Sequence, residues 1–184
     1  MKSITIEQIY QDILDGKRKR FPQFTWSQDI NFELSKRVTK YLIEHVLLWD
    51  RDAIRKGWNQ RLIIKMKLST VLSRYNSSPY AMLNDAYPNF IKEWELGMAP
   101  LKFWTKDNAL EALRWTIEEK KQLTDQQLYL VYGEKWLRKH KLSAPCGIYW
   151  NGSPYAYLNS LYPEKFKECE FLASSNNYWT KRRH

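Results

Sequence analysis

Hydrophobic and polar positions follow the period of an α-helix in a stretch of thirteen residues that the chain carries twice. The first copy, NSSPYAMLNDAYP, spans residues 76–88, and the second, NGSPYAYLNSLYP, spans residues 151–163. In each copy three large residues fall at i, i+3 and i+7, which places them on one face of a helix. These residues are Tyr80, Leu83 and Tyr87 in the first copy, and Tyr155, Leu158 and Tyr162 in the second. Each copy is therefore predicted to form a short helix of about two turns.

Both stretches also carry the start and stop signals of a helix. Ser78 and Ser153 are good N-caps, and the proline after each of them suits the first helical turn, where its missing N–H is not needed. A second proline, Pro88 or Pro163, ends each helix. We call these two predicted elements the SPY helices. Their residues expected to fill the core are Leu83, Tyr87, Leu158 and Tyr162.

The rest of the chain is also helical in pattern, and no segment shows the clear alternation of a strand. Capping residues and apolar spacing predict helices over residues 5–14, 28–48, 105–121, 124–132 and 134–140. Only 6 Gly and 7 Pro are available for turns, which argues against a sheet of many strands. The predicted fold class is all-α.

The repeat extends beyond the two short stretches. Residues 76–106 align with residues 151–181 without a gap, and the matches include the SPY helices and the segments that follow them. Two further matches lie upstream, with one small gap between them. They are WSQD at 26–29 with WTKD at 104–107, and KMKL at 65–68 with KHKL at 139–142.

Most of the chain is thus predicted to be two small helix-turn-helix-like units in tandem. Residues 1–25 form an N-terminal helix and basic arm, residues 26–103 the first unit, and residues 104–184 the second unit with a basic tail. The unit is longer than common helical repeats, so we expect a small subdomain rather than one rung of a solenoid.

Composition indicates a soluble globular protein, with 43% hydrophobic and 27% charged residues. No apolar run reaches the ~18 residues of a membrane span, and the N-terminal stretch lacks the apolar core of a signal peptide. Cys146 and Cys169 have neither metal-ligand nor disulfide-framework spacing, so both thiols are expected to be reduced. We therefore expect a cytoplasmic protein without membrane contact.

Basic residues outnumber acidic ones, and their placement is uneven. The formal net charge of +10 favours a polyanionic partner, either nucleic acid or an acidic protein surface. Residues 53–84 and 135–163 contain no Asp or Glu, and both stretches run into a SPY helix. Their candidate phosphate contacts are Arg55, Lys56, Arg61, Lys65, Lys67 and Arg74 in the first stretch, and Lys135, Arg138, Lys139 and Lys141 in the second. The alternative interpretation is a pair of solvated helix faces.

Aromatic residues and helix starts within these stretches strengthen the nucleic-acid interpretation. Basic side chains beside exposed rings suit phosphate contacts combined with stacking on bases. The candidate rings are Tyr75, Tyr80, Trp150 and Tyr155, with Trp58, Trp136 and Tyr149 nearby in the sequence. The helix starts at Ser78 and Ser153 offer backbone N–H groups to a phosphate. Asn84 and Asn159 are candidates for reading adenine, with a local backbone bond as the alternative.

Two more basic clusters lie outside the acid-free stretches. The first contains Lys17, Arg18, Lys19 and Arg20, and the second contains Lys181, Arg182 and Arg183. Each suits either a flexible arm on a polyanion or a solubilising linker or tail.

The sequence contains no enzyme or metal-site motif that we recognise. Walker, GxGxxG, HExxH, GxSxG and CxxC motifs are all missing. His45, His140 and His184 are scattered, and no carboxylate pair suggests the metal chemistry of a nuclease. We therefore expect a protein that is not an enzyme, with no catalytic residue, metal ligand or cofactor.

A resemblance to a known family rests on four segments. They are the repeated motif SPYxxLNxxYP, GKRKRFP at 16–22, KEWEL at 92–96 and KECEF at 167–171. The chain resembles an uncharacterised family of Firmicute and phage proteins built from this repeat. This resemblance covers nearly the whole chain and implies no activity and no functional residues. A more distant similarity is to the helical DNA-binding repeats found beside homing endonucleases. The second copy departs from the motif at Cys169, where the first has Trp94.

These features together predict a nucleic-acid-binding protein, with double-stranded DNA as the favoured partner, in a regulatory or phage-related role. One alternative is a protein-interaction module, such as a phage-encoded inhibitor that binds an acidic host protein. A second alternative is RNA binding. The oligomeric state stays open.

Overall fold

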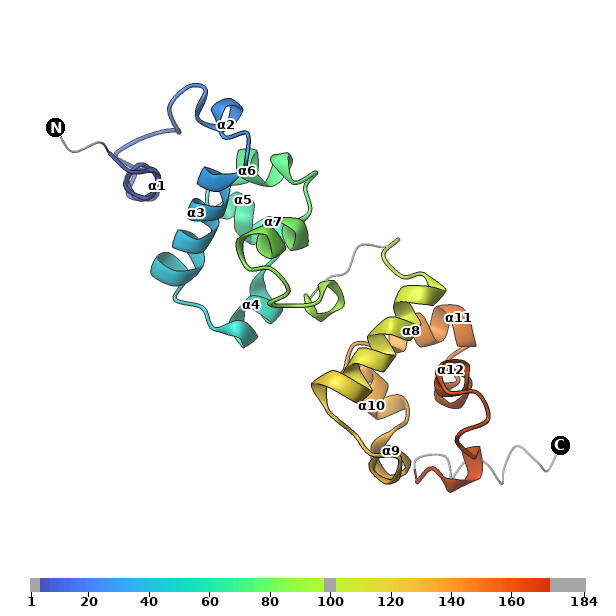
Figure 1. The fold of residues 1–184 in the computed structure, drawn as a ribbon. Helices are drawn as coiled ribbons and strands as arrows, with labels where there is room; N and C mark the ends of the chain where they lie inside the picture. Colours follow the sequence, from blue (N-terminus) through green and yellow to red (C-terminus); the bar gives the residue numbers. More distant parts are fainter. Residues whose placement is uncertain (1–3, 98–101, 173–184) are drawn as a thin grey trace. The chain divides into compact units, whose positions relative to one another are not determined.

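The computed structural model describes residues 4–97 and 102–172, and all regular structure in these ranges is helical. The chain divides into two compact units, Met1–Ala99 and Pro100–His184, whose helices are labelled in Figure 1. No strand occurs in the described ranges, which confirms the predicted all-α class. In the same ranges, no helix combines the length and the apolar character needed to cross a membrane.

Unit 1 opens with two helices, α1 (Ile6–Leu14) and α2 (Thr25–Gln28). A longer helix, α3 (Glu33–Tyr41), follows and continues as the π-helical turn η1 (Leu42–Leu47). The remaining elements are α4 (Arg51–Gly57), α5 (Gln60–Lys65), α6 (Ser69–Arg74), α7 (Pro79–Ala86) and the 3₁₀ turn η2 (Glu93–Glu95).

Unit 2 repeats this order from the long helix onward. Helix α8 (Lys106–Trp115) also continues as a π-helical turn, η3 (Thr116–Lys120). Its other elements are α9 (Asp125–Val131), α10 (Glu134–Lys139), α11 (Ser143–Trp150), α12 (Pro154–Leu161) and the 3₁₀ turn η4 (Glu168–Glu170). In residues 4–97 and 102–172 both units therefore share a long helix with a π-helical end, three short helices, a SPY helix and a 3₁₀ turn, and unit 1 has α1 and α2 in addition.

The SPY helices α7 and α12 are built alike, as predicted. The Ser78 hydroxyl oxygen accepts a bond from the Ala81 N–H at 3.1 Å, and Ser153 accepts one from Ala156 at 3.2 Å. Leu83 and Leu158 are fully buried, which confirms their predicted place in the core. The final tyrosines differ from the prediction, because both are only half-buried. Their hydroxyls donate to exposed glutamates: Tyr87 to Glu44 at 2.5 Å and Tyr162 to Glu118 at 2.6 Å.

The start of the long helix in unit 1 differs from the prediction. Helix α3 begins at Glu33 rather than at residue 28. The Asp29 carboxylate accepts bonds from the backbone N–H groups of Leu34 and Ser35, at 2.9 and 3.0 Å. These groups have no partner inside a helix, so Asp29 caps α3 from outside it. WSQD and WTKD are therefore not equivalent, because Asp107 lies within the first turn of α8.

Helix α1 completes the core of unit 1 and lies beside α3 (Figure 1). Tyr10 is fully buried, and its hydroxyl donates to the Met66 carbonyl oxygen at 2.7 Å. Unit 2 has larger rings at two matching positions: Trp115 and Trp136, both buried, stand where unit 1 has Tyr41 and Leu62.

Candidate nucleic-acid interface

The KMKL and KHKL segments form the same turn in both units. Helices α5 and α10 end at the first lysine of each segment, and the third residue, Lys67 or Lys141, has a positive φ of 63° or 61°. The backbone N–H of the next residue reaches back five positions, from Leu68 to Ile63 at 3.1 Å and from Leu142 to Leu137 at 2.8 Å. This is the left-handed helix ending that usually carries glycine.

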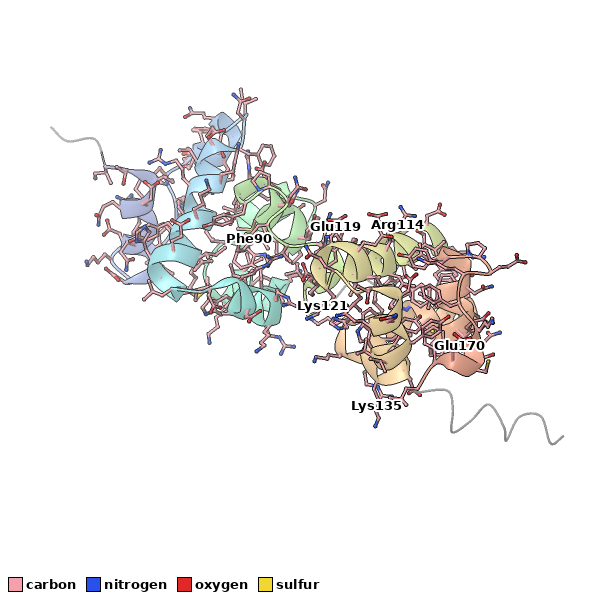
Figure 2. All side chains as sticks on the ribbon, turned by 60° about the horizontal axis from the view of Figure 1, so that its bottom comes forward. Phe90, Arg114, Glu119, Lys121, Lys135 and Glu170 are labelled. Atoms are coloured by element: carbon pink, nitrogen blue, oxygen red, sulfur yellow. The ribbon has the colours of Figure 1, made fainter. Side chains whose placement is uncertain are left out.

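Three basic positions recur around each of these turns. We call them the turn cations: Arg61, Lys65 and Lys67 in unit 1, and Lys135, Lys139 and Lys141 in unit 2. All six side chains are exposed, and that of Lys135 points away from α10 into solvent (Figure 2). On α5, Arg61 lies two positions before the buried Ile63 and Lys65 lies two positions after it. Two positions correspond to a rotation of about 200° around the helix axis, so both side chains face away from the core. Leu137 has the same place between the cations of α10.

Acidic side chains leave most of the turn cations uncompensated. In residues 4–97 and 102–172, no salt bridge engages Arg61, Lys65, Lys67, Lys135 or Lys139. The nearby Arg138 differs, because it is exposed but pairs with Glu134 at 2.5 Å. The turn cations thus concentrate positive charge at the KMKL turn of unit 1 and the KHKL turn of unit 2.

Two predicted phosphate contacts lie elsewhere. Arg55 is half-buried between Asp52, at 3.2 Å, and the buried Glu95, at 3.5 Å. Arg74 donates to the backbone carbonyl oxygens of Trp26 and Asp29. Its guanidinium also lies 4.3 Å from the centre of the Phe32 ring. Both arginines are therefore engaged inside unit 1, whereas the predicted Lys56 is exposed on α4.

The predicted stacking rings are not exposed. Trp150 is buried, stacks on Tyr157 at 4.2 Å between ring centres and donates its indole N–H to Ser160 at 2.7 Å. Tyr75, Tyr80 and Tyr155 are half-buried; the hydroxyl of Tyr75 donates to Asp85 at 2.8 Å and that of Tyr155 to the Phe166 carbonyl at 3.1 Å. Trp58 and Trp136 are buried as well. The prediction that these rings are exposed for stacking on bases is therefore wrong.

The polar candidates at the SPY helices have structural partners. Ser78 and Ser153 use their hydroxyl oxygens to cap their own helices. The Asn84 side-chain oxygen accepts the Asn89 backbone N–H at 3.0 Å, and that of Asn159 accepts the Glu164 N–H at 3.0 Å. The local backbone bond, the alternative to reading adenine, is therefore confirmed for both asparagines.

The basic arm of residues 17–20 connects α1 to α2 and is anchored at its end. Lys17 pairs with Asp15 at 3.0 Å, Arg18 is half-buried, and Lys19 and Arg20 are exposed. The next residue, Phe21, stacks on Tyr10 at 6.0 Å, and Tyr10 donates to Met66 within the KMKL turn. Tyr10 thus links the arm to the turn cations of unit 1, a connection that no sequence pattern indicated. Lys181, Arg182 and Arg183 lie outside the described residues.

Reactive groups in the described ranges give no second candidate site. No group of three or more His, Cys, Asp or Glu side chains there is placed to hold a metal ion. Burial raises the pKa of the Cys146 thiol to about 11, so this thiol is protonated at neutral pH. Cys169 is exposed on η4.

Comparison with known families gave a match within unit 1. Residues 6–93 match the sequence profile of a family described as Protein of unknown function (DUF4046). The match begins at the first residue of α1 and ends at the first residue of η2. Neither the curated proteins nor the solved structures gave a match.

Proposed function

We propose that the protein binds nucleic acid, with double-stranded DNA as the favoured partner, through the turn cations. The observation that carries this proposal is the recurrence of three exposed cations at matching positions of both units. The residues beside these cations differ between the two units: Ile64 of unit 1 corresponds to Arg138 of unit 2, and Met66 corresponds to His140. A regulatory or phage-related setting and a cytoplasmic location belong to the same proposal, the setting resting on the resemblance of the repeat.

The backbone of Lys67 and Lys141 supports this proposal. A side chain other than glycine in the left-handed region costs roughly 1–2 kcal/mol, and glycine is the usual residue at this place in a helix ending. Both units nevertheless carry lysine there. Strained residues that persist in this way cluster at functional sites. Positive charge at the tip of the turn is the property that glycine would not supply.

The mechanism is phosphate binding with release of counterions. Each phosphate neutralised by Lys or Arg steepens the dependence of log K on log salt by about 0.9 for duplex DNA. Phosphate contacts position a protein on the duplex without reading its sequence, so this contact is independent of sequence. Two units on one chain raise the apparent affinity because binding by one increases the local concentration of the other.

The test is the salt dependence of binding to duplex DNA, single-stranded DNA and structured RNA, measured by fluorescence anisotropy. The variant K135A/K139A/K141A removes the turn cations of unit 2. Its control, K102A/K106A/K121A, removes three other exposed lysines of the same unit and gives the same net charge. We expect the first variant to weaken duplex binding and to lower the salt slope by up to about 2.7, at 0.9 for each contact, and the control to change both much less.

Two outcomes would contradict the proposal. Equal losses in the two variants would show that net charge, rather than the turn cations, drives binding. Absence of binding to all three nucleic acids at low salt, together with nuclease-resistant capture of an acidic protein, would favour a protein partner. Tighter binding to structured RNA than to duplex DNA would change the partner but not the site.

A further inference from the structure

Phe24 is the only exposed aromatic residue in residues 4–97 and 102–172, with 62% of its surface accessible. It follows the basic arm by four positions and precedes the single turn of α2. Every aromatic ring predicted from sequence to stack on bases is buried or half-buried. The ring that is free to contact a partner is therefore one that the sequence pattern did not single out.

The backbone around Phe24 is rigidly held. The Thr25 backbone N–H and hydroxyl both donate to the Pro22 carbonyl oxygen, at 3.3 and 2.8 Å. The Phe24 carbonyl oxygen accepts from the Gln28 N–H at 3.0 Å and from the Ser27 hydroxyl at 3.1 Å. These bonds fix both sides of Phe24, so its ring projects from an ordered segment.

Neighbouring side chains tie this segment to the body of unit 1. Phe21 packs edge-on against Trp26 at 4.7 Å between ring centres, and Arg74 of α6 binds the Trp26 carbonyl oxygen. Figure 1 accordingly shows α2 beside α6. Phe21 also stacks on Tyr10, which donates to the KMKL turn. The segment that carries the exposed ring is therefore linked to the arm and to the KMKL turn through Phe21 and Tyr10.

Phe24 itself is held in an unfavourable conformation. Its φ is 67°, in the left-handed region that bulky side chains rarely adopt. Strained residues of this kind are enriched at functional sites. Phe24 shares its strain and exposure with Leu48, but Phe24 follows the basic arm and Leu48 does not.

We propose that Phe24 is an intercalating wedge, which enters a base step of duplex DNA while Lys19 and Arg20 hold the adjacent phosphates. This inference rests on the proposed nucleic-acid binding and adds the contact to bases. Phenylalanine is among the apolar side chains that partly unstack a base step and kink the duplex.

A nucleic acid fits this surface better than an anionic membrane does. Interfacial helices bury a continuous apolar face along several turns, whereas α2 has one turn of four residues. The other exposed apolar residue near α2 is Ile30, which lies beyond its opposite end. A single projecting ring flanked by cations matches one base step.

The experiment uses the full chain and a short duplex with a fluorophore at each end. Energy transfer between the ends reports bending, and anisotropy reports affinity at several salt concentrations. Wild type should bend the duplex; F24A should bind about tenfold more weakly, bend it little and keep the wild-type salt slope, because no phosphate contact is lost. F24Y keeps a ring and should behave as wild type. L48A is the matched control, since Leu48 is 77% exposed with a φ of 52° but lies outside the basic arm, and the nearest Arg or Lys in sequence, Arg51, pairs with Glu95.

The outcomes separate this inference from the proposed function. Normal affinity and bending by F24A, with the steep salt slope intact, would reject the wedge and leave phosphate binding standing. Failure of the wild type to bind duplex DNA at low salt would reject both. Binding to vesicles of anionic phospholipid that F24A loses, without any bending of DNA, would also reject the wedge in favour of a membrane contact.

Discussion

The indole N–H of Trp58 donates a 2.8 Å hydrogen bond to the backbone carbonyl oxygen of Pro79. Trp58 is buried at the end of α4, and Pro79 is the first residue of α7, so this bond attaches the SPY helix to α4. In unit 2 the Tyr132 hydroxyl makes the matching bond, at 2.7 Å, to the Pro154 carbonyl oxygen. Two different side chains thus donate to the carbonyl oxygen of the first proline in each SPY helix, so both units have this attachment.

Removing the Tyr132 hydroxyl should destabilise unit 2 while leaving its volume nearly unchanged. Tyr132→Phe removes this bond but leaves the Pro154 carbonyl oxygen its acceptor role within α12, so the expected loss is the net value of one hydrogen bond, about 0.5–1.5 kcal/mol. Urea unfolding followed by tryptophan fluorescence measures the change. Ile148→Ala, at an exposed position of α11, should stay within about 0.5 kcal/mol of wild type. Equal unfolding curves for Tyr132→Phe and wild type would show that the bond contributes no net stability.

Asp29 should make the stability of unit 1 depend on pH. Burial alone would raise the pKa of this carboxyl, but the bonds from Leu34 and Ser35, with the charge of Arg74, outweigh burial and lower it. A lowered folded-state pKa gives stability that is present above the unfolded value of about 3.9 and is lost as pH falls through the folded-state value. Thermal melts between pH 7 and pH 2 should therefore show a loss that starts near pH 4.

The variant Asp29→Asn tests the source of this dependence. It should lower stability at pH 7, because an amide has one acceptor oxygen where Asp29 uses two. It should also flatten the decline below pH 4. Asp107→Asn is the control, since Asp107 is exposed in α8 although the two residues match in sequence. A decline of unchanged steepness in Asp29→Asn would assign the pH dependence to other carboxyls.

Asn84 and Asn159 should act on stability and not on base recognition. Each holds the turn after its SPY helix, where Asn89 and Glu164 have a positive φ of 58°. Loss of such a cap costs about 1 kcal/mol. Asn84→Ala should thus lower the melting temperature and leave the relative affinities for different duplex sequences unchanged. A selective loss of affinity for sites containing adenine would instead support the hypothesis that Asn84 recognises adenine.

The helices were predictable because their signals are local. Ser78, Pro79 and Pro88 specify the first SPY helix without reference to the rest of the chain, and the same three signals recur in the second copy. The outward direction of Lys65 and Lys139 also follows from helical period, given a buried Ile63 and Leu137. The start of α3 was not predictable from period, because Asp29 binds backbone groups of residues five and six positions further on.

Whether an aromatic or arginine side chain is exposed or engaged inside its unit depends on packing, which the sequence does not show. Trp136 and Phe24 both lie near basic residues in the chain, yet only Phe24 is exposed. Arg74 resembles Arg61 in its sequence surroundings, but its guanidinium has several donors and satisfies two backbone carbonyls inside unit 1. Composition and charge pattern therefore predict a class of partner, and burial is needed to choose among the candidate residues.

The turn lysines allow a prediction in which stability and binding change in opposite directions. Lys141→Gly removes the left-handed strain at 61° and also the exposed charge. Glycine loses more backbone entropy on folding, which offsets part of the relief, so we expect a net gain of up to about 1 kcal/mol in the free energy of unfolding. Duplex affinity should fall and the salt slope should decrease by about 0.9.

Gln122→Gly separates these two effects. Gln122 lies in the same unit, is exposed and uncharged, and has a φ of 49°. Its replacement should bring a similar gain in stability with unchanged duplex affinity, measured by urea unfolding and by anisotropy across salt concentrations. If Lys141→Gly gained stability but bound DNA as wild type does, its strained lysine would have no role in binding. The backbone support for the turn cations as the interface would then be lost.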